Sequence, residues 1–174
     1  MRYINFEEAD QGVMPDELFM REALREARIA LELDEVPIGA VIVHGGRIIA
    51  RGHNLTERLN DVTAHAEMQA FTAAANFIGG KYLRDCTLYV TVEPCVMCAG
   101  AAYWTQLKRI VFGAADSKRG YSHFDAGAVA TAGSSSDRGP HSPLLHPKTE
   151  VLSGVLEAEC AELIQSFFRN KRQS

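Results

Sequence analysis

The chain has 174 residues, of which 47% are hydrophobic and 23% are charged, and its 18 lysines and arginines against 22 acids give a formal charge of −4. This length predicts one domain over residues 1–174, and this composition excludes wholesale disorder, collagen-like repeats and a coiled-coil rod. Because no apolar run reaches about 18 residues and the N-terminus lacks the apolar stretch of a secretory signal, we expect a cytoplasmic protein without a membrane span.

Hydrophobic periodicity along the chain predicts alternating helices and strands. The predicted helices span about residues 15–33, 65–77, 95–105 and 157–168. The predicted strands span residues 36–43, 48–52, 86–92, 109–114 and 150–154, and a turn at residues 44–47 joins the first two. Helices between strands predict parallel neighbours, whereas the opening hairpin predicts one antiparallel pair at the edge. The expected architecture is α/β, with a mixed five-stranded sheet between two helical layers (α/β/α).

Two segments fall outside this pattern, an N-terminal arm of residues 1–14 and a stretch of about residues 119–148. The second contains a Gly-Ser-Ser-Ser run and three prolines. Loops longer than roughly 15 residues are uncommon in compact domains and are usually functional or mobile. We expect a surface insertion here, with a short helix near residues 124–131 and a poorly ordered tip at residues 134–143.

The four cysteines are too few for a disulfide framework at this length, so their spacing decides what they do. Cys86 lies in the apolar strand 86–92, which is predicted to be buried on both faces. Cys160 lies on the apolar face of the closing helix, from which Phe167 and Phe168 are expected to point inward. Both cysteines are therefore predicted to be small core residues.

The other two cysteines belong to a pattern that predicts a metal site. Cys95 and Cys98 are three residues apart, so one helical turn brings both sulfurs to the same face at a helix N-terminus, where the dipole favours thiolates. His65, at the start of another predicted helix, supplies a third ligand. Three ligands leave the fourth position of a tetrahedral zinc ion to water, which is the arrangement of catalytic sites. We therefore predict one Zn²⁺ per chain.

Glu67 follows the predicted ligand His65 by two residues, within the first helical turn. A carboxylate there lies beside the metal-bound water, from which it can take a proton and pass it to a leaving nitrogen. Glu67 is thus the predicted catalytic residue of a hydrolytic reaction, whose substrate these residues leave open. The combined pattern, H-x-E followed by P-C-x-x-C, is the signature of zinc nucleobase deaminases.

Several blocks around this signature resemble the tRNA adenosine deaminase family, a branch of the cytidine deaminase superfamily. They cover most of the chain, roughly residues 16–122 and 146–172, and include residues 35–41, 52–54, 63–67, 87–101, 111–116, 159–163 and 167–169. The resemblance implies a cytidine deaminase-like fold, a homodimer, and conversion of adenosine to inosine at the wobble position of a tRNA anticodon stem-loop. It also implies the roles of particular residues.

By this resemblance, His65, Cys95 and Cys98 hold zinc, and Glu67 carries protons to the base and to departing ammonia. The backbone N–H groups of Ala66 and Cys95 line the hydroxide side of the pocket. The remaining substrate contacts that it implies come from three side chains, namely Asn54 on the flipped purine, Asp116 near the ribose hydroxyl and Lys118 on a phosphate.

Two alternatives stay open. After residues 116–118 the family's Gly-Ala-x-Gly-Ser run is replaced by residues 119–124, Arg-Gly-Tyr-Ser-His-Phe, and the chain is acidic. A deaminase of a free base or nucleoside, such as guanine or cytosine, would fit both observations, and a zinc-stabilised binding module without turnover is a third hypothesis. The net acidity argues only weakly against RNA binding. It is concentrated in residues 1–35, which hold ten acids and four bases, and the rest of the chain is net positive.

Overall fold

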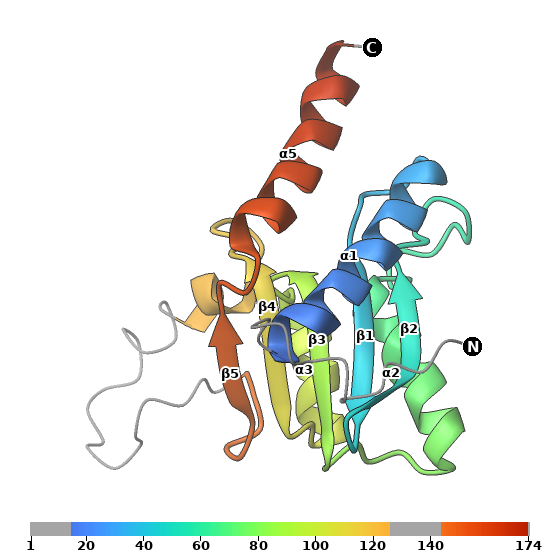
Figure 1. Cartoon of the computed structure of the whole chain (residues 1–174), viewed down its shortest axis with the longest axis vertical. Coiled ribbons are helices and arrows are strands. Elements are labelled where there is room, and N and C mark those ends of the chain that lie inside the picture. Colours follow the sequence, from blue (N-terminus) through green and yellow to red (C-terminus); the bar gives the residue numbers. More distant parts are fainter. Residues whose placement is uncertain (1–14, 126–143, 174) are drawn as a thin grey trace.

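The computed structural model describes residues 15–125 and 144–173, so the predicted arm 1–14 and loop tip 134–143 lie outside it (Figure 1). The helices are α1 (Pro15–Glu32), α2 (Ala66–Ile78), α3 (Val96–Thr105) and α5 (Glu157–Gln173). The strands are β1 (Gly39–His44), β2 (Arg47–His53), β3 (Cys86–Val92), β4 (Arg109–Ala114) and β5 (Glu150–Ser153). None of the described helices is long and apolar enough to cross a membrane.

The five strands form one mixed sheet in the order β2-β1-β3-β4-β5, which confirms the predicted strand count and mixed character. β3, β4 and β5 run parallel, and β1 and β2 form the predicted antiparallel hairpin. A second antiparallel pair, between β1 and β3, differs from the predicted topology. The α2 crossover joins β2 to β3, which run in the same direction, but β1 lies between them.

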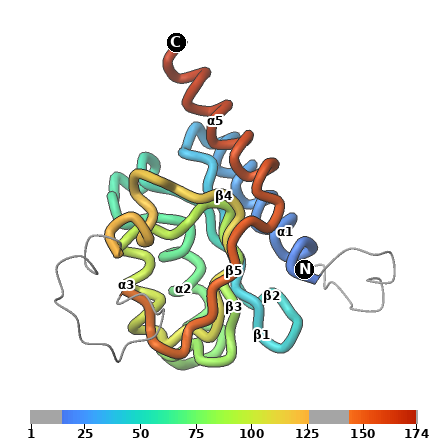
Figure 2. The backbone as a smooth tube through the Cα atoms, turned by 90° about the vertical axis from the view of Figure 1, so that its left-hand side faces the viewer, coloured from blue at the N-terminus to red at the C-terminus, as the bar shows by residue number. Residues whose placement is uncertain are grey.

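Helices cover both faces of the sheet, as predicted (Figure 2). On one face α2 and α3 pack against side chains that include Ile42 and Leu88. On the other face α1 and α5 pack against Val41, Tyr89 and Val111. Neighbouring residues of one strand thus enter different cores, because successive side chains of a strand point to opposite faces.

Glycines allow two of these helices to approach the sheet closely. A Cβ on Gly39 would collide with the backbone of α1, and a Cβ on Gly52 would collide with the backbone of α2 at Ala66 and Ala70. Any larger residue would push the helix outward. The second contact fixes the first turn of α2, which follows His65.

The glycines at one turn and one helix end also have the backbone conformations that the sequence predicts. Gly45 and Gly46 both have positive φ, 53° and 73°, as the tight turn of the β1–β2 hairpin requires. Gly79, at φ 71°, ends α2 and donates its N–H to the Ala75 carbonyl. These glycines occupy the two positions where the sequence predicted a turn and a helix end.

The C-terminal helix differs from its prediction in length and in one inward residue. It continues to Gln173 instead of ending near residue 168, and its last half projects past the end of the sheet (Figure 1). Phe167 is buried as expected, but Phe168 is 43% exposed, because adjacent helical residues point about 100° apart. The prediction for Phe168 was therefore wrong.

The ends of the predicted insertion belong to the folded body. Residues 121–125 are helical, close to the short helix expected near residues 124–131, of which residues 126–131 lie outside the described part. Tyr121 and Leu145 are both buried in the core on the α2–α3 side. The segment therefore leaves and re-enters the fold beside α3.

Candidate metal and catalytic site

The N-termini of α2 and α3 place the predicted metal ligands side by side. His65 is the N-cap of α2 and Cys95 the N-cap of α3, both with extended backbone, and Cys98 lies in the first turn of α3. Since β3 ends at Val92, three residues before Cys95, the sheet fixes the start of α3. The N–H groups of both helix starts therefore point into one region.

The three side chains have the geometry of a single metal centre. His65 Nδ1 lies 3.6 Å from Cys95 Sγ and 3.6 Å from Cys98 Sγ, and all three atoms lie within 4.8 Å of one another. Metal bonds of about 2.1 Å to nitrogen and about 2.3 Å to sulfur, arranged tetrahedrally, place nitrogen and sulfur about 3.6 Å apart. These residues could thus hold one tetrahedral ion without rearrangement.

Electrostatics at this cluster favours one thiolate, that of Cys95, whereas the hydrogen bond with Cys95 and burial raise the pKa of the Cys98 thiol. The hydrogen bond with Cys98, and then the one with His65, lowers the pKa of the Cys95 thiol to about 4. The same contact with Cys95 raises the pKa of His65 above its ordinary value. The N-terminus of α3 stabilises negative charge further. To bind a metal ion as a thiolate, Cys98 would have to lose its proton.

Glu67 lies beside the cluster in the first turn of α2 and is 4% exposed. Burial raises the pKa of its carboxyl to about 7, and the negative charge of Cys95 acts in the same direction. A carboxyl with a pKa near neutrality can both accept and release a proton at that pH. Glu67 therefore has the burial and the position that a proton carrier needs.

The cluster opens into a cavity of about 900 Å³. His65, Glu67 and Cys95 line it, whereas Cys98 is 1% exposed and is not among its lining residues. The four residues predicted to contact substrate also line this cavity: Asn54, Ala66, Asp116 and Lys118. The structure thus brings together at one cavity residues that lie far apart in sequence.

The projecting half of α5 forms another wall of the cavity. Its contributions include the exposed Phe168 and two cations, Arg169 and Arg172. Lys118 and Arg119 line the cavity from the segment after β4. Four cations therefore line the cavity, together with four acids: Glu57, Glu67, Glu93 and Asp116.

Two buried carboxylates that the sequence analysis did not single out support this cavity. Glu93, at 6% exposure, accepts hydrogen bonds from the backbone N–H groups of Asp116 and Ser122, both at 3.0 Å. It thereby holds the segment that carries Lys118. Glu35, which is fully buried, accepts a hydrogen bond from the Asn54 amide at 3.1 Å. The available signal was an acid one or two residues before a proline in an apolar stretch, at residues 35–38 and 90–94.

The Asp116 side chain stabilises the turn formed by residues 116–119. Its Oδ1 accepts the backbone N–H groups of Lys118 and Arg119, each at 3.0 Å. A carboxylate in such a turn presents its second oxygen elsewhere. Asp116 therefore combines a structural contact with a place on the cavity wall.

Comparisons with known proteins agree with this fold and this site. A family described as MafB19-like deaminase matches residues 14–172. The tRNA-specific adenosine deaminase of Agrobacterium fabrum is 47% identical over 154 residues, which cover 88% of this chain and 94% of that protein. The chloroplastic tRNA(adenine(34)) deaminase of Arabidopsis thaliana is 45% identical over 160 residues, and these span 88% of this chain but only 12% of that much longer protein.

A solved structure of a related deaminase shows the same similarity. It comes from studies of A-to-I editing by tRNA:A34 deaminases at the wobble position of transfer RNA, and it superposes with a TM-score of 0.71 at 43% identity, covering 84% of this chain and 98% of the other. The three-layer fold and the His-Cys-Cys cluster thus define a deaminase of the cytidine deaminase-like class. Within that class, the chain belongs to the family of tRNA-specific adenosine deaminases.

Proposed function

We propose that this protein is a zinc-dependent hydrolytic deaminase that converts adenosine to inosine at the wobble position of a tRNA anticodon stem-loop, with one Zn²⁺ per chain. The observation that carries the proposal is the placement of buried Glu67 beside the His65, Cys95 and Cys98 cluster, at a cavity that could admit a flipped nucleotide. The identity of 41–47% to curated tRNA-specific adenosine deaminases supports the choice of adenosine.

A zinc ion held by His65, Cys95 and Cys98 would supply a water molecule activated for attack near neutral pH. Glu67 takes one proton from that water and delivers it to a ring nitrogen of the base. It then takes the proton of the hydroxyl group that has added to the base and delivers it to the departing amino group, so adenosine and water give inosine and ammonia. The Ala66 and Cys95 N–H groups, at two helix starts, face the side where negative charge develops.

Recognition of the RNA follows from the cavity walls. Asn54 offers a buried amide to the flipped base, and Asp116 is placed for the ribose. Lys118, Arg119 and Arg172 line the opening, where phosphates of a stem-loop carry the complementary charge. These contacts suit a polynucleotide better than a free base, because a free base has no phosphate to pair with the cations.

We further infer a homodimer and a cytoplasmic location. Two aromatic side chains on α3, Tyr103 and Trp104, are 36% and 78% exposed and contact each other. Large apolar side chains exposed together are typical of a protein interface. Trp104→Glu should convert a dimer to a monomer in sedimentation velocity, and a wild-type monomer would contradict the inference.

The cysteines support the cytoplasmic location, because all four are free, as expected of a reducing compartment. The single sheet supports one domain over residues 1–174.

The decisive experiment compares substrates on the purified zinc-loaded protein. An anticodon stem-loop with adenosine at the wobble position is offered alongside free adenosine, guanine, cytosine and cytidine, and ammonia release is measured. We expect turnover of the stem-loop and none of the free compounds. Turnover of guanine alone would make the protein a free-base deaminase, and no turnover of any substrate by a zinc-loaded, folded protein would leave only the binding module.

Glu67→Gln separates catalysis from zinc binding. The variant cannot carry a proton, so we expect stem-loop turnover to fall by about 100-fold or more, while zinc content and thermal stability stay close to wild type. Glu157→Gln is the matched control, since Glu157 is another acid in the first helical turn, at α5. Full activity of Glu67→Gln would contradict the assigned role.

A further inference from the structure

Behind the cavity lies a fully buried carboxylate for which the proposed mechanism has no use. Glu35 is 0% exposed and lies between α1 and β1, outside both elements. Its own backbone N–H donates to the Ala30 carbonyl at 2.9 Å, so the end of α1 fixes its position. A buried carboxylate without partners is costly, and the hydrogen bonds that it makes therefore indicate what it does.

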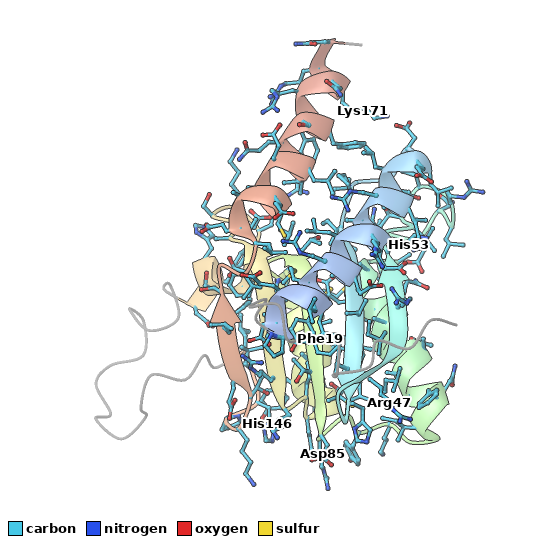
Figure 3. The ribbon with its side chains drawn as sticks, in the orientation of Figure 1. Phe19, Arg47, His53, Asp85, His146 and Lys171 are labelled. Atoms are coloured by element: carbon cyan, nitrogen blue, oxygen red, sulfur yellow. The ribbon has the colours of Figure 1, made fainter. Side chains whose placement is uncertain are left out.

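Among the described residues, the hydrogen bonds that the Glu35 carboxylate accepts come from one short segment, residues 54–58, most of which lines the cavity. Oε1 accepts the Arg58 N–H at 2.8 Å, and Oε2 accepts the Glu57 N–H at 3.2 Å and the Thr56 hydroxyl at 3.3 Å. Oε2 also accepts the Asn54 amide at 3.1 Å. This segment begins directly after β2, at the position marked by His53 in Figure 3.

The contact with Glu35 decides which end of the Asn54 amide faces the cavity. A carboxylate only accepts hydrogen bonds, so the amide atom beside it is Nδ2, the donor. Nδ2 also donates to the Thr56 hydroxyl at 3.1 Å, which uses the second of its two hydrogens. Asn54 is 4% exposed and lines the cavity, and its Oδ1 accepts no hydrogen bond from the described residues. The free atom of the amide is therefore an acceptor.

We propose that Glu35 is a positioning residue, which acts through Asn54 by holding its amide so that Oδ1, a hydrogen-bond acceptor, meets the substrate base. The inference rests on the proposed function, since it assigns the orientation of a base contact in that cavity. It predicts that the base presents a donor, such as an exocyclic amino group, toward Asn54. Glutamine in place of Glu35 offers the Asn54 amide both an oxygen and an NH2 group, so either orientation of Asn54 finds a partner and a donor faces the base part of the time.

A double-mutant cycle on stem-loop deamination tests this role. Glu35→Gln and Asn54→Ala should each lower kcat/KM by about tenfold, the effect expected for one lost hydrogen bond in a dry site. If Glu35 acts through Asn54, the double variant is no more than about twofold worse than Asn54→Ala alone. Independent effects, giving about a 100-fold loss in the double variant, would overturn the proposal.

Glu93→Gln is the matched control, because Glu93 is also a buried carboxylate that holds a cavity segment but has no contact with Asn54. Its effect on kcat/KM should multiply with that of Asn54→Ala. As a second test, the exchange variant Glu35→Gln with Asn54→Asp keeps one amide and one carboxylate in contact and still presents an acceptor oxygen. It should be more active than Asn54→Asp alone, and lower activity would overturn the proposal.

A measurement without turnover separates this inference from the proposed function. In wild type the Asn54 side-chain amide hydrogens should exchange with water slowly in NMR spectra, and at least tenfold faster in Glu35→Gln. In Glu93→Gln their exchange should equal that of wild type. Equal exchange in Glu35→Gln and wild type would overturn the positioning role even if the stem-loop is deaminated. Slow wild-type exchange without any deamination would leave the positioning role intact and remove the proposed substrate.

Discussion

Replacing Asp16 with asparagine tests how the start of α1 is held to the sheet. Asp16 accepts hydrogen bonds from Nη1 and Nη2 of Arg109 at 2.8 and 2.9 Å, and from the Tyr89 hydroxyl at 2.7 Å. Arg109 begins β4 and Tyr89 lies in β3, so one carboxylate joins the helix to two strands. In Asp16→Asn one acceptor oxygen becomes a donor, and a guanidinium N–H loses its partner.

The size of the effect follows from exposure and charge. A hydrogen bond to a charged group contributes about 1.5–3 kcal/mol, and an acid in the first turn of a helix adds about 0.3–1 kcal/mol. The side chains of Asp16 and Arg109 are 22% and 28% exposed, so solvent places the pair at the low end of that range. We expect the free energy of unfolding at pH 7 to fall by about 2 kcal/mol, which lowers Tm by about 4–8 °C for a chain of this size.

The loss should depend on pH in one direction. The hydrogen bond from Arg109 holds the pKa of Asp16 below its ordinary value of 3.8. A carboxyl whose pKa is lower in the folded than in the unfolded chain stabilises the fold above the unfolded value, and that contribution disappears as pH falls through the folded value. The gap between wild type and Asp16→Asn should therefore be full near pH 7 and shrink as pH falls below 3.8.

Urea unfolding followed by circular dichroism at a series of pH values measures both quantities. Glu17→Gln is the matched control, because Glu17 shares the first turn of α1 with Asp16 and loses only its interaction with the helix dipole. Metal release at low pH affects wild type and variants alike and cancels in the difference. Equal losses for the two substitutions, or a gap that persists unchanged at low pH, would refute the reasoning.

Two further outcomes are expected. Cys95→Ala should reduce bound zinc, measured by mass spectrometry of the metal, from about one per chain to below about 0.1, since two ligands hold the ion weakly, while Cys86→Ala in the core should keep it. Retained zinc in Cys95→Ala would contradict the assigned ligand set. Arg172→Glu should raise KM for the stem-loop several-fold and reduce the dependence of KM on salt, because it removes one phosphate contact. A salt dependence equal to that of wild type would show that Arg172 does not meet the RNA.

Most of the sheet could be predicted from local patterns, but its strand order could not. The strand and helix periods along the chain are local properties, and they gave all five strands within a few residues. Which strands pair depends on where α2 returns the chain, which no local pattern records. One signal was present: the apolar run of residues 39–43 is typical of a central strand, whereas Arg47 and Arg51 mark β2 as an edge.

The metal cluster was more predictable than the walls around it. His65, Cys95 and Cys98 carry a spacing that has few uses besides metal binding, so the pattern alone indicated the chemistry. Phe168 and Glu35 carry no such spacing. The place of Phe168 on the cavity wall depends on α5 continuing beyond its last apolar residue, and the role of Glu35 depends on burial against a loop that lies 19 or more residues away in sequence.

The overall charge of −4 is a poor guide to what this chain binds, because several acids of α1 and of the segment that follows it have partners inside the fold. Asp16 pairs with Arg109, the buried Glu22 with Arg51, and Glu35 with the loop that follows β2. Acids with such partners contribute little field at a distance in physiological salt. The cations at the cavity come from two other segments, residues 116–119 and the end of α5. An RNA phosphate can therefore pair with these individual cations at the cavity wall, and the net charge of the chain says little about the proposed substrate.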